Sequence, residues 1–310
     1  MLHDFTFRDP AEILNELQAG GGGHAMHAKM DHSTMAGMKM NGMAMGSDVA
    51  FDALLANDRT LDDPEVVVVD KGGILRLRLI NAAAATNMWI DLGPLKGQLI
   101  AVDGNAVKPI IVQRFPLAIA QRADVRIQLS NQSGSWPVIF QSEGATLRGG
   151  IVLKSGDAAL TKISDQGEAG EAISLNFENS LRVPYELKKN TLAQRVSVML
   201  TGGDDGYQWG FNGRPMMHDV LFRVKPETRV ELTMHNLTAM AHPMHLHGHY
   251  FQVTKINGKA FEGALRDTVL IPPGENVSVE FDTDNPGKWA FHCHHLYHMN
   301  SGMMAAMAYV

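Results

Sequence analysis

The chain has 310 residues, which is enough for two domains that each bury a hydrophobic core. Its formal net charge of -6 argues against a nucleic-acid partner, because phosphate binding needs a clustered positive field. The sequence lacks any run approaching the roughly 20 apolar residues that span a bilayer.

The N-terminal residues MLHDFTFRDP lack the basic-then-apolar order of a signal peptide, so we expect a cytosolic chain or a piece cut from a longer one. A single cysteine, Cys293, excludes an internal disulfide. His and Met, by contrast, number 14 and 19. Both residue types are clustered, so their positions carry the information.

The first predicted segment, residues 1–48, is Met- and His-rich and flexible. Residues 20–48 contain seven Met and three His among Gly, Ala, Ser and Lys, with no apolar period of 2 or 3.6 residues. One interpretation is a flexible linker. The other is loose binding of cuprous or other soft ions by thioethers and by His24, His27 and His32, which would feed a copper site or buffer copper.

Two β-domains follow in the prediction. Short β-rich runs such as ILRLRLI and WPVIF, separated by Gly, Asn, Asp and Pro, fill residues 49–155 and predict an all-β sandwich. A polar, Gly-containing stretch, residues 156–180, predicts a linker. Residues 181–310 repeat the pattern with runs such as RVELTMHN and KWAFHCH. The predicted fold is therefore all-β, with two sandwiches in tandem.

The two halves look like copies of one unit. LRLRLINAAAATN, VDGNAV, ADVRIQL and GSWPVIFQ recur in order as VELTMHNLTAMAH, INGKAF, NVSVEF and GKWAFHCH. The alignment places Asn87 opposite His242, Ile90 opposite His245, Leu92 opposite His247, and Ile139, Phe140 and Gln141 opposite His292, Cys293 and His294. The second copy is thus built to hold metal, whereas the first fills the same places mostly with packing residues.

The segment WAFHCHHLYHMNSGMM brings metal-binding residue types together. On a strand, successive side chains point to opposite faces, so His292 and His294 project one way and Cys293 the other. Metals held on the two faces would be joined by one residue of backbone, which is a short covalent route for an electron. His298 and Met303 follow Cys293 by five and ten residues, and a loop can fold both back toward the sulfur.

The partner segment is HPMHLHGHYF, in which His245 and His247 share one strand face and His242, before a proline, points separately. Pairing the two segments predicts two metal clusters. The first has the two-His, one-Cys, axial-Met set of a blue-copper electron-transfer site: His242, Cys293, His298 and Met303. The second is all imidazole and suits copper that changes redox state: His245, His247, His292 and His294.

Zinc is the competing metal for both clusters. Zinc hydrolase sites generally recruit a carboxylate and keep an open water position, yet neither segment has an Asp or Glu between its histidines. The added Cys293 and Met303 favour copper, whose reduced form prefers soft sulfur ligands.

HPMHLHGH and HCHHLYHMNSGMM resemble the two C-terminal copper signatures of multicopper oxidases, most closely those of the bacterial copper-resistance and laccase-like class. The resemblance implies two tandem cupredoxin-like Greek-key β-sandwiches, matching the middle and last domains of a three-domain enzyme. It implies type 1 copper ligands in His242, Cys293, His298 and Met303, a type 2 ligand in His245, and type 3 ligands in His247, His292 and His294. Cys293, His292 and His294 would then carry electrons between the sites.

The sequence departs from the resembled enzymes in its histidine count. Those enzymes complete their oxygen-reducing cluster with four further histidines, in two His-x-His pairs of the first domain. This sequence has no His-x-His pair outside the two segments quoted above. We therefore expect a truncated enzyme or a specialised two-domain variant, completed by a first cupredoxin domain in trans or by a homo-oligomer.

Three functions remain open at this point. As an oxidase, the chain would take single electrons from phenols or cuprous ion at a type 1 copper and reduce O2 to water. As an electron-transfer module, it would bind copper without reacting with O2. As a copper-sequestering protein, it would use the β-domains as a scaffold for the Met-rich tract. The resembled full-length enzymes are periplasmic, which is the location that the resemblance implies.

Overall fold

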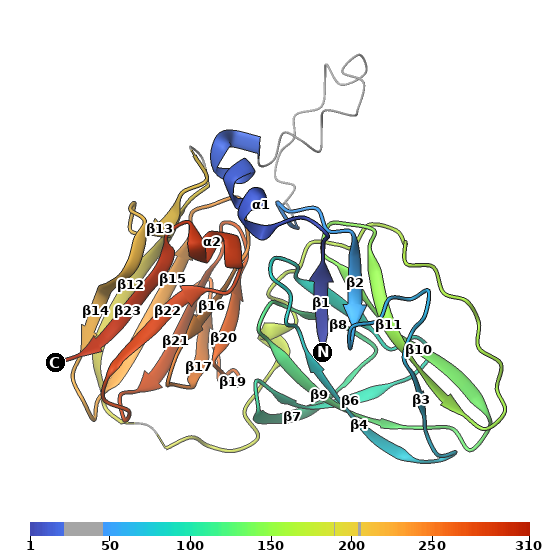
Figure 1. The fold of residues 1–310 in the computed structure, drawn as a ribbon. Helices are drawn as coiled ribbons and strands as arrows, with labels where there is room; N and C mark the ends of the chain where they lie inside the picture. Colours follow the sequence, from blue (N-terminus) through green and yellow to red (C-terminus); the bar gives the residue numbers. More distant parts are fainter. Residues whose placement is uncertain (22–45, 189, 204–205) are drawn as a thin grey trace, which may run out of the picture.

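The computed structural model describes residues 1–21, 46–188, 190–203 and 206–310 (Figure 1). Most of the Met- and His-rich tract, including His24, His27 and His32, lies outside the described residues, so its flexibility and its metal binding stay predictions. None of the helices in the described ranges combines the length and the apolar character needed to cross a bilayer.

Residues 1–21 are folded, which corrects the prediction that residues 1–48 are flexible. They form β1 (Leu2–Phe5), which pairs antiparallel with β2 (Ala53–Ala56), then α1 (Pro10–Glu16) and the short turn η1 (Leu17–Gly21). The helix begins at Asp9, whose side chain accepts a 2.8 Å hydrogen bond from the backbone N–H of Ala11. A strand of 4 residues and a helix of 7 are too short to give a clear hydrophobic period.

Two sheets pack face to face in the first sandwich (Figure 1), with strand orders β3-β11-β10-β5-β8 and β4-β9-β6-β7. The strands are β3 (Val66–Val68), β4 (Ile74–Ile80), β5 (Met88–Asp91), β6 (Gly97–Val102), β7 (Asn105–Val112), β8 (Arg114–Leu117), β9 (Arg122–Gln128), β10 (Gly134–Ser142) and β11 (Arg148–Ser155). Leu99, Val125 and Phe140 are buried in the core of this sandwich.

The second sandwich pairs a sheet of order β13-β12-β15-β21-β17-β18, with β19 beside β17, with a sheet of order β14-β23-β22-β16-β20. Its elements are β12 (Leu192–Gly202), β13 (Trp209–Phe211), β14 (Met216–Val224), β15 (Arg229–Asn236), β16 (His242–Leu246), β17 (Phe251–Ile256), β18 (Lys259–Ala260), β19 (Leu265–Arg266), β20 (Thr268–Ile271), β21 (Asn276–Asp282), β22 (Lys288–Cys293), α2 (Leu296–Asn300) and β23 (Met303–Tyr309). Met234, Val279 and Phe291 lie in its core.

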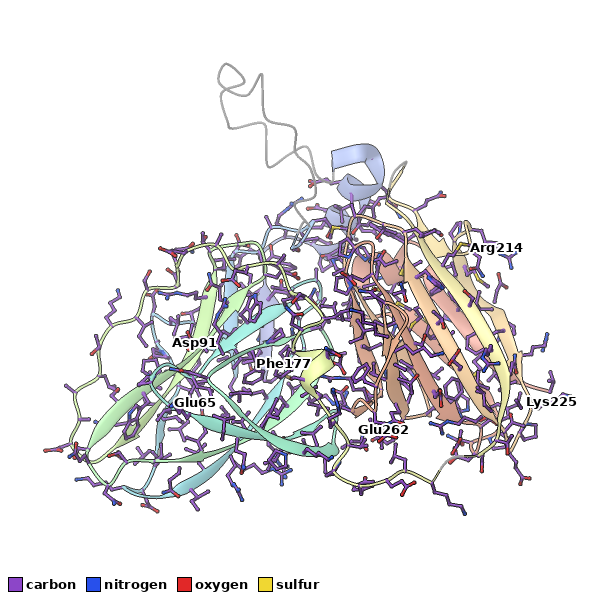
Figure 2. All side chains as sticks on the ribbon, turned by 180° about the vertical axis from the view of Figure 1, so that it is seen from behind. Glu65, Asp91, Phe177, Arg214, Lys225 and Glu262 are labelled. Carbon is purple, nitrogen blue, oxygen red and sulfur yellow. The ribbon has the colours of Figure 1, made fainter. Side chains whose placement is uncertain are left out.

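The segment between the sandwiches is longer than the predicted linker, residues 156–180. The second sandwich begins with β12 at Leu192 rather than at residue 181, and among the described residues before it the regular structure is the 3-10 helix η2 (Glu178–Ser180). Phe177 in this segment lies at the boundary between the two sandwiches (Figure 2). Its ring stacks on Phe115, with centroids 5.7 Å apart, so the segment packs against the first sandwich.

The internal repeat holds in three dimensions, but its alignment shifts by one residue. Asn81 and Asn236 occupy equivalent places, because each side chain donates hydrogen bonds to two backbone carbonyls around the strand that follows. Counted along the paired strands, Met88 takes the place of His242, whereas the sequence alignment put Asn87 there. The loop after Asn81 is one residue longer than the loop after Asn236, and the sequence pattern does not mark the extra residue.

The same register corrects two further predicted pairs. Asp91, not Ile90, is equivalent to His245, and Gly93, not Leu92, is equivalent to His247. It confirms the predicted equivalence of Phe140 and Cys293. Gly149 stands at the place of Met303, and a Cβ atom there would lie 2.3 Å from the ring of Phe140. Met88 and Phe140 are buried, so packing side chains fill two of the metal-ligand places in the first sandwich.

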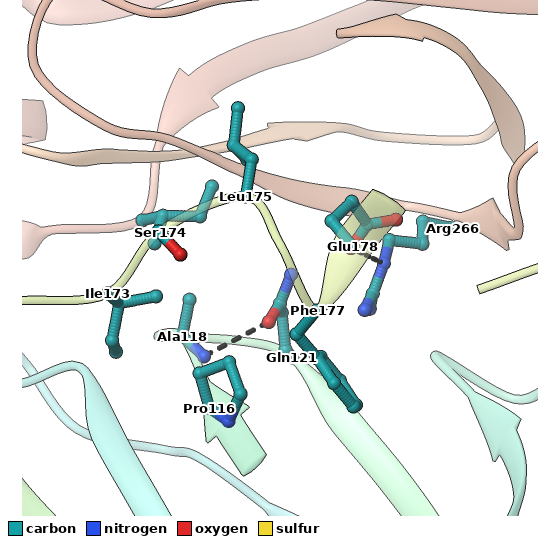
Figure 3. Close-up of a pocket in the computed structure, with 10 residues that line it drawn as sticks. Pro116, Ala118, Gln121, Ile173, Ser174, Leu175, Phe177, Glu178 and Arg266 are labelled. Atoms are coloured by element: carbon teal, nitrogen blue, oxygen red, sulfur yellow. Dashed lines mark hydrogen bonds and ion pairs between the residues drawn. The ribbon is translucent and has the colours of Figure 1, made fainter. Parts of the chain in front are cut away.

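Charged side chains join the two sandwiches. Arg122 on β9 donates two hydrogen bonds of 2.7 Å to the carboxylate of Asp267, just before β20. The buried guanidinium of Arg266 donates to Asp103 at 3.0 Å and to Glu178 at 2.8 Å, and Figure 3 shows the contact with Glu178. Removing one partner of a buried ion pair is strongly destabilising, so these contacts hold the sandwiches in one arrangement.

Candidate metal centres

Three of the four side chains predicted for a blue-copper site, those of His242, Cys293 and His298, come together in the second sandwich. The end of the sandwich that carries α2 lies near α1 (Figure 1). Cys293 ends β22, His242 begins β16, His298 lies on α2 and Met303 begins β23. Sγ of Cys293 lies 3.7 Å from Nδ1 of His242 and 3.9 Å from Nδ1 of His298, and the two nitrogens are 3.2 Å apart. All four residues are fully buried.

These three ligand atoms fit a single transition-metal ion. A point equidistant from them lies about 2.1 Å from each, within the ~2.0–2.3 Å range of bonds from zinc to nitrogen and sulfur. Blue-copper sites use two imidazoles, a thiolate and a weakly bound thioether. The first three are present here, and the thioether of Met303 is buried at the start of the next strand. The pocket therefore fits a first-row transition-metal ion in size, and its donor set favours copper.

Burial sets the protonation of this pocket in the metal-free chain. It raises the pKa of the Cys293 thiol, and it lowers the pKa of His298 to about 3 and that of His242 well below the usual range. Both imidazoles are therefore neutral at neutral pH and present a lone pair for a metal. The thiol keeps its proton until a metal displaces it, so metal binding releases a proton.

Each imidazole is also held through its outer nitrogen. Nε2 of His242 lies 2.7 Å from Oγ1 of Thr238, and Nε2 of His298 lies 3.3 Å from Oδ2 of Asp48. An imidazole that binds metal through Nδ1 carries its proton on Nε2, so Thr238 and Asp48 accept these hydrogen bonds and fix both rings. Burial alone would raise the pKa of Asp48, but His295 and His298 hold it well below the usual range.

An indole ring closes one side of the thiol site. Trp209 stacks on His298 with ring centroids 3.9 Å apart, and it meets His242 edge-on at 5.2 Å. Tyr207 packs against Trp209 and donates a short hydrogen bond to Asp48. These buried aromatic side chains keep water away from the ligands.

Several of these supporting residues were not predicted from the sequence. Asp48 lies 250 positions from His298 along the chain, at the edge of the tract predicted to be flexible, so local spacing carries no signal for it. Trp209 and Tyr207 likewise lie outside the two metal-binding segments. Thr238 is four positions from His242, and that short distance was an available signal.

The predicted imidazole cluster also assembles. Rings of its members lie 4.8 to 5.5 Å apart between centroids, and Nε2 of His247 is 3.0 Å from Nε2 of His292. The members come from β16, β22 and the residues that follow each strand: His245, His247, His292 and His294. Ligand atoms of His245, His247 and His292 all lie within 4.8 Å of one another, which is close enough to share an ion.

Backbone carbonyls orient two of these rings, and the cluster reaches the surface. Nδ1 of His245 donates to the carbonyl of Asp267 at 2.7 Å, and Nδ1 of His292 donates to the carbonyl of Cys293 at 2.9 Å, which leaves both Nε2 atoms free for metal. Burial, together with the neighbouring histidines, lowers the pKa of His292 to about 4 and that of His294 to about 3. His247 is exposed, whereas the thiol site is enclosed.

Comparisons with known proteins agree with these features. A sequence model described as multicopper oxidase matches residues 1–154, and a second model with the same description matches residues 190–310. The chain is 29% identical over 266 residues to Multicopper oxidase MmcO of Mycobacterium tuberculosis, covering 86% of this chain and 52% of that protein. It is 36% identical over 336 residues to Copper resistance protein A of Escherichia coli, covering 75% of this chain and 55% of that protein.

Solved structures show the same fold. Fet3p, a multicopper oxidase that functions in iron import, superposes with a TM-score of 0.76 at 16% identity, over 99% of this chain and 64% of that one. The laccase from Botrytis aclada superposes with a TM-score of 0.74 at 18% identity, over 99% and 62%. Both confirm the predicted all-β cupredoxin fold.

The chain spans about half the length of the curated relatives that it matches. The two matching models together cover most of the sequence, and the two candidate metal centres lie inside the second of them. The chain therefore belongs to the multicopper oxidase family, a family of oxidoreductases whose cofactor is copper.

Proposed function

We propose that the chain works in a copper-dependent oxidase that takes electrons from phenols or cuprous ion and reduces O2 to water. The observation that carries this proposal is the placement of Cys293. Its thiol belongs to the buried site, while its two sequence neighbours, His292 and His294, belong to the imidazole cluster. One residue of backbone therefore joins the thiol site, which would accept electrons from a donor, to the imidazole cluster, which would pass them to O2.

The ligand roles in this proposal follow the geometry and the resemblance together. The buried site takes a type 1 copper, held by His242, Cys293, His298 and Met303. The imidazole cluster supplies one type 2 ligand, His245, and three type 3 ligands, His247, His292 and His294. When bound, copper supplies one-electron chemistry at the first site and oxygen reduction at the second.

The protein holds the ligands of the thiol site in fixed positions and keeps water away from them. Thr238 and Asp48 accept the outer N–H groups of the two imidazoles, so the rings cannot turn when the charge at the site changes. Trp209 and the buried strands exclude water, which makes the environment of the thiol rigid and apolar. A rigid pocket of this kind favours electron transfer because the ligands do not rearrange between oxidation states.

Completion of the oxygen-reducing cluster is part of the proposal. Four imidazoles supply half of the eight histidines that the resembled enzymes use, so we propose that a first cupredoxin domain in trans or a further copy of this chain supplies the rest. The exposed ring of His247 supports this arrangement, since it is accessible to a partner. We propose a periplasmic location, as in the resembled full-length enzymes.

A copper-binding electron-transfer or copper-sequestering module is the second candidate. It is favoured by the contrast between the two sites: the thiol site is enclosed and has four donors, whereas the imidazole cluster is partly exposed. In that case the chain would bind about one copper tightly and would leave O2 untouched.

Copper per chain, visible colour and O2 uptake together test the proposal. Copper-loaded protein should be blue, and Cys293→Ser should lose the colour because the copper–thiolate bond produces it. With a phenolic donor, three or four tightly bound coppers and sustained O2 uptake support the oxidase, whereas one copper and no uptake support the electron-transfer module. A colourless wild-type protein with bound copper would contradict both. Replacing the exposed His218 by alanine is the matched control and should leave colour and uptake unchanged.

A further inference from the structure

Two ligands of the imidazole cluster are oriented through their rings, but the exposed ligand His247 is not. Backbone carbonyls accept hydrogen bonds from Nδ1 of His245 and from Nδ1 of His292. In the part of the chain that the structure describes, no hydrogen bond reaches Nδ1 of His247, and its Nε2 faces Nε2 of His292 at 3.0 Å. The position of the His247 ring therefore depends on the backbone that carries it.

His247 lies on a turn directly after β16, and β22 fixes one side of this turn. Gly248 has a φ of 71°, in the left-handed region that favours glycine, and a Cβ atom there would lie 2.5 Å from the ring of Trp289. The backbone N–H of His247 donates to the carbonyl of Ala290 at 2.9 Å. Trp289 and Ala290 both belong to β22, so this strand limits the conformation of the turn.

Side chains hold the two carbonyl groups of the turn. Nδ1 of His249 lies 3.1 Å from the carbonyl oxygen of His247. Because a carbonyl oxygen can only accept a hydrogen bond, this nitrogen carries a proton and donates it. The side-chain amide of Asn285, which precedes β22, donates to the carbonyl of Gly248 at 2.9 Å. These two hydrogen bonds fix the backbone directly after His247.

The hydroxyl group of Tyr309, on β23, connects these two supporting residues. Its oxygen lies 2.7 Å from Nε2 of His249, and since Nδ1 carries the proton of the neutral ring, Nε2 accepts and the hydroxyl donates. The same oxygen accepts the backbone N–H of Asn285 at 3.3 Å. The ring of His249 is buried and lies at an interplanar angle of 22° to that of Tyr309. One hydroxyl group therefore connects β23 to the turn that carries His247.

We propose that His249 and Tyr309 are positioning residues for the metal ligand His247. His249 bonds to the carbonyl of His247, so it acts through the backbone rather than on the ring. A ligand whose backbone is fixed is preorganised for metal, in the way that backbone carbonyls preorganise the rings of the other two ligands. The inference rests on the proposed function in one respect, which is that the imidazole cluster binds metal.

Zinc binding tests the proposal without O2 or a phenolic donor. Zn²⁺ suits imidazole ligands, and copper loaded beforehand at the thiol site keeps zinc out of that site. The variants are Tyr309→Phe, which removes the hydroxyl and keeps the ring, and His249→Leu, which removes both ring nitrogens. The matched control is Ser278→Ala, because the buried hydroxyl of Ser278 shares a 2.8 Å hydrogen bond with Thr233 on the opposite sheet of the same sandwich.

Tyr309→Phe and His249→Leu should bind zinc at the cluster about 10-fold more weakly than wild type, the lower end of the effect of a lost orienting partner. Ser278→Ala should bind zinc as tightly as wild type, although denaturant unfolding of the metal-free chain should show a loss of stability. His249→Asn should recover affinity, because its side-chain amide can donate to the carbonyl of His247 as Nδ1 does.

NMR of the histidine ring nitrogens separates positioning from general stabilisation. On addition of zinc, the ring resonances of His245, His247 and His292 should all shift in wild type. In Tyr309→Phe the shift at His247 should be reduced, while the shifts at the other two histidines remain. A residue that only stabilised the fold would not single out His247.

Unchanged zinc affinity in Tyr309→Phe and His249→Leu would overturn the proposal, and so would an equal loss in Ser278→Ala. If His249→Leu does not fold, Tyr309→Phe decides the question alone. In protein that takes up no blue copper, the same titration is made with Cys293→Ser added to each chain. A wild type without zinc at the cluster would contradict the proposed function and this inference together, whereas zinc bound equally by wild type and variants contradicts this inference alone.

Discussion

Replacing Thr238 with valine removes one hydroxyl and keeps the shape of the side chain. The hydroxyl lies 2.7 Å from Nε2 of His242 and 3.2 Å from the backbone N–H of Met240, so the change leaves buried donors unpaired. An unsatisfied buried donor costs about 1–3 kcal/mol of unfolding free energy. Loss of the partner that orients a metal-bound histidine lowers metal affinity by roughly 10- to 100-fold. We therefore expect Thr238→Val to weaken copper binding more than it weakens the fold.

Two measurements separate these effects. Copper affinity is measured by competition with a chelator, following the blue absorption, and the unfolding free energy of the copper-free chain is measured with denaturant. Thr238→Ser keeps the hydroxyl and should restore affinity. Thr233→Val is the matched control, because Thr233 shares a 2.8 Å hydrogen bond with Ser278 and is not a neighbour of the metal ligands in sequence. It should change stability without changing copper affinity.

The result that refutes this reasoning is a Thr238→Val protein that binds copper as tightly as wild type. That outcome would mean that packing alone holds the ring of His242. An equal loss of affinity in Thr238→Val and Thr233→Val would instead show that affinity follows global stability, not the orientation of one ligand.

Other variants and conditions test the remaining features. Met303→Leu should keep the blue colour and raise the reduction potential, measured by redox titration, because the axial thioether stabilises the oxidised metal. Deleting residues 22–45, which spares Asp48, should leave both sandwiches folded by circular dichroism and reduce oxidation of cuprous ion more than oxidation of a phenol. In the copper-free chain, the pKa values of His294 and His298 are lowered to about 3, so the unfolded state binds more protons below its pKa of ~6.5. Their contribution to stability should therefore be complete above that pH and lost as the pH falls toward 3, which denaturant unfolding at several pH values measures.

The ligands could be predicted because strand geometry forces them together. Period-2 alternation places Cys293 opposite to His292 and His294 on any strand, and the structure has β22 end at Cys293. The register of β16 against β22 then brings the two segments side by side, with His245 opposite His292. Metal-binding residues that lie close together in a short segment can be predicted from the sequence, because the local backbone geometry fixes the directions of their side chains.

The remaining features depend on contacts that no local pattern encodes. Asp48 lies 250 positions from His298 along the chain, so no local spacing links the two residues. The alignment of the two halves failed by one residue after Asn81, because the loop there is one residue longer than the loop after Asn236 and a comparison of segments of equal length carries no gap. The hydrogen-bonded pairing of the strands gives the correct register, in which the buried Ile90 is equivalent to the buried Met244.

Contacts from outside the second sandwich support both of its metal centres. Asp48 fixes His298 at the thiol site, and its position depends on the folded N-terminal segment, since Ile13 of α1 shares a hydrophobic core with Val49. At the imidazole cluster, Arg122 of the first sandwich holds Asp267, whose carbonyl orients His245. The first sandwich lacks the metal ligands of its sibling, yet through these contacts it helps to set the geometry of both sites. The first sandwich therefore contributes to the geometry of the metal sites as well as to the stability of the chain.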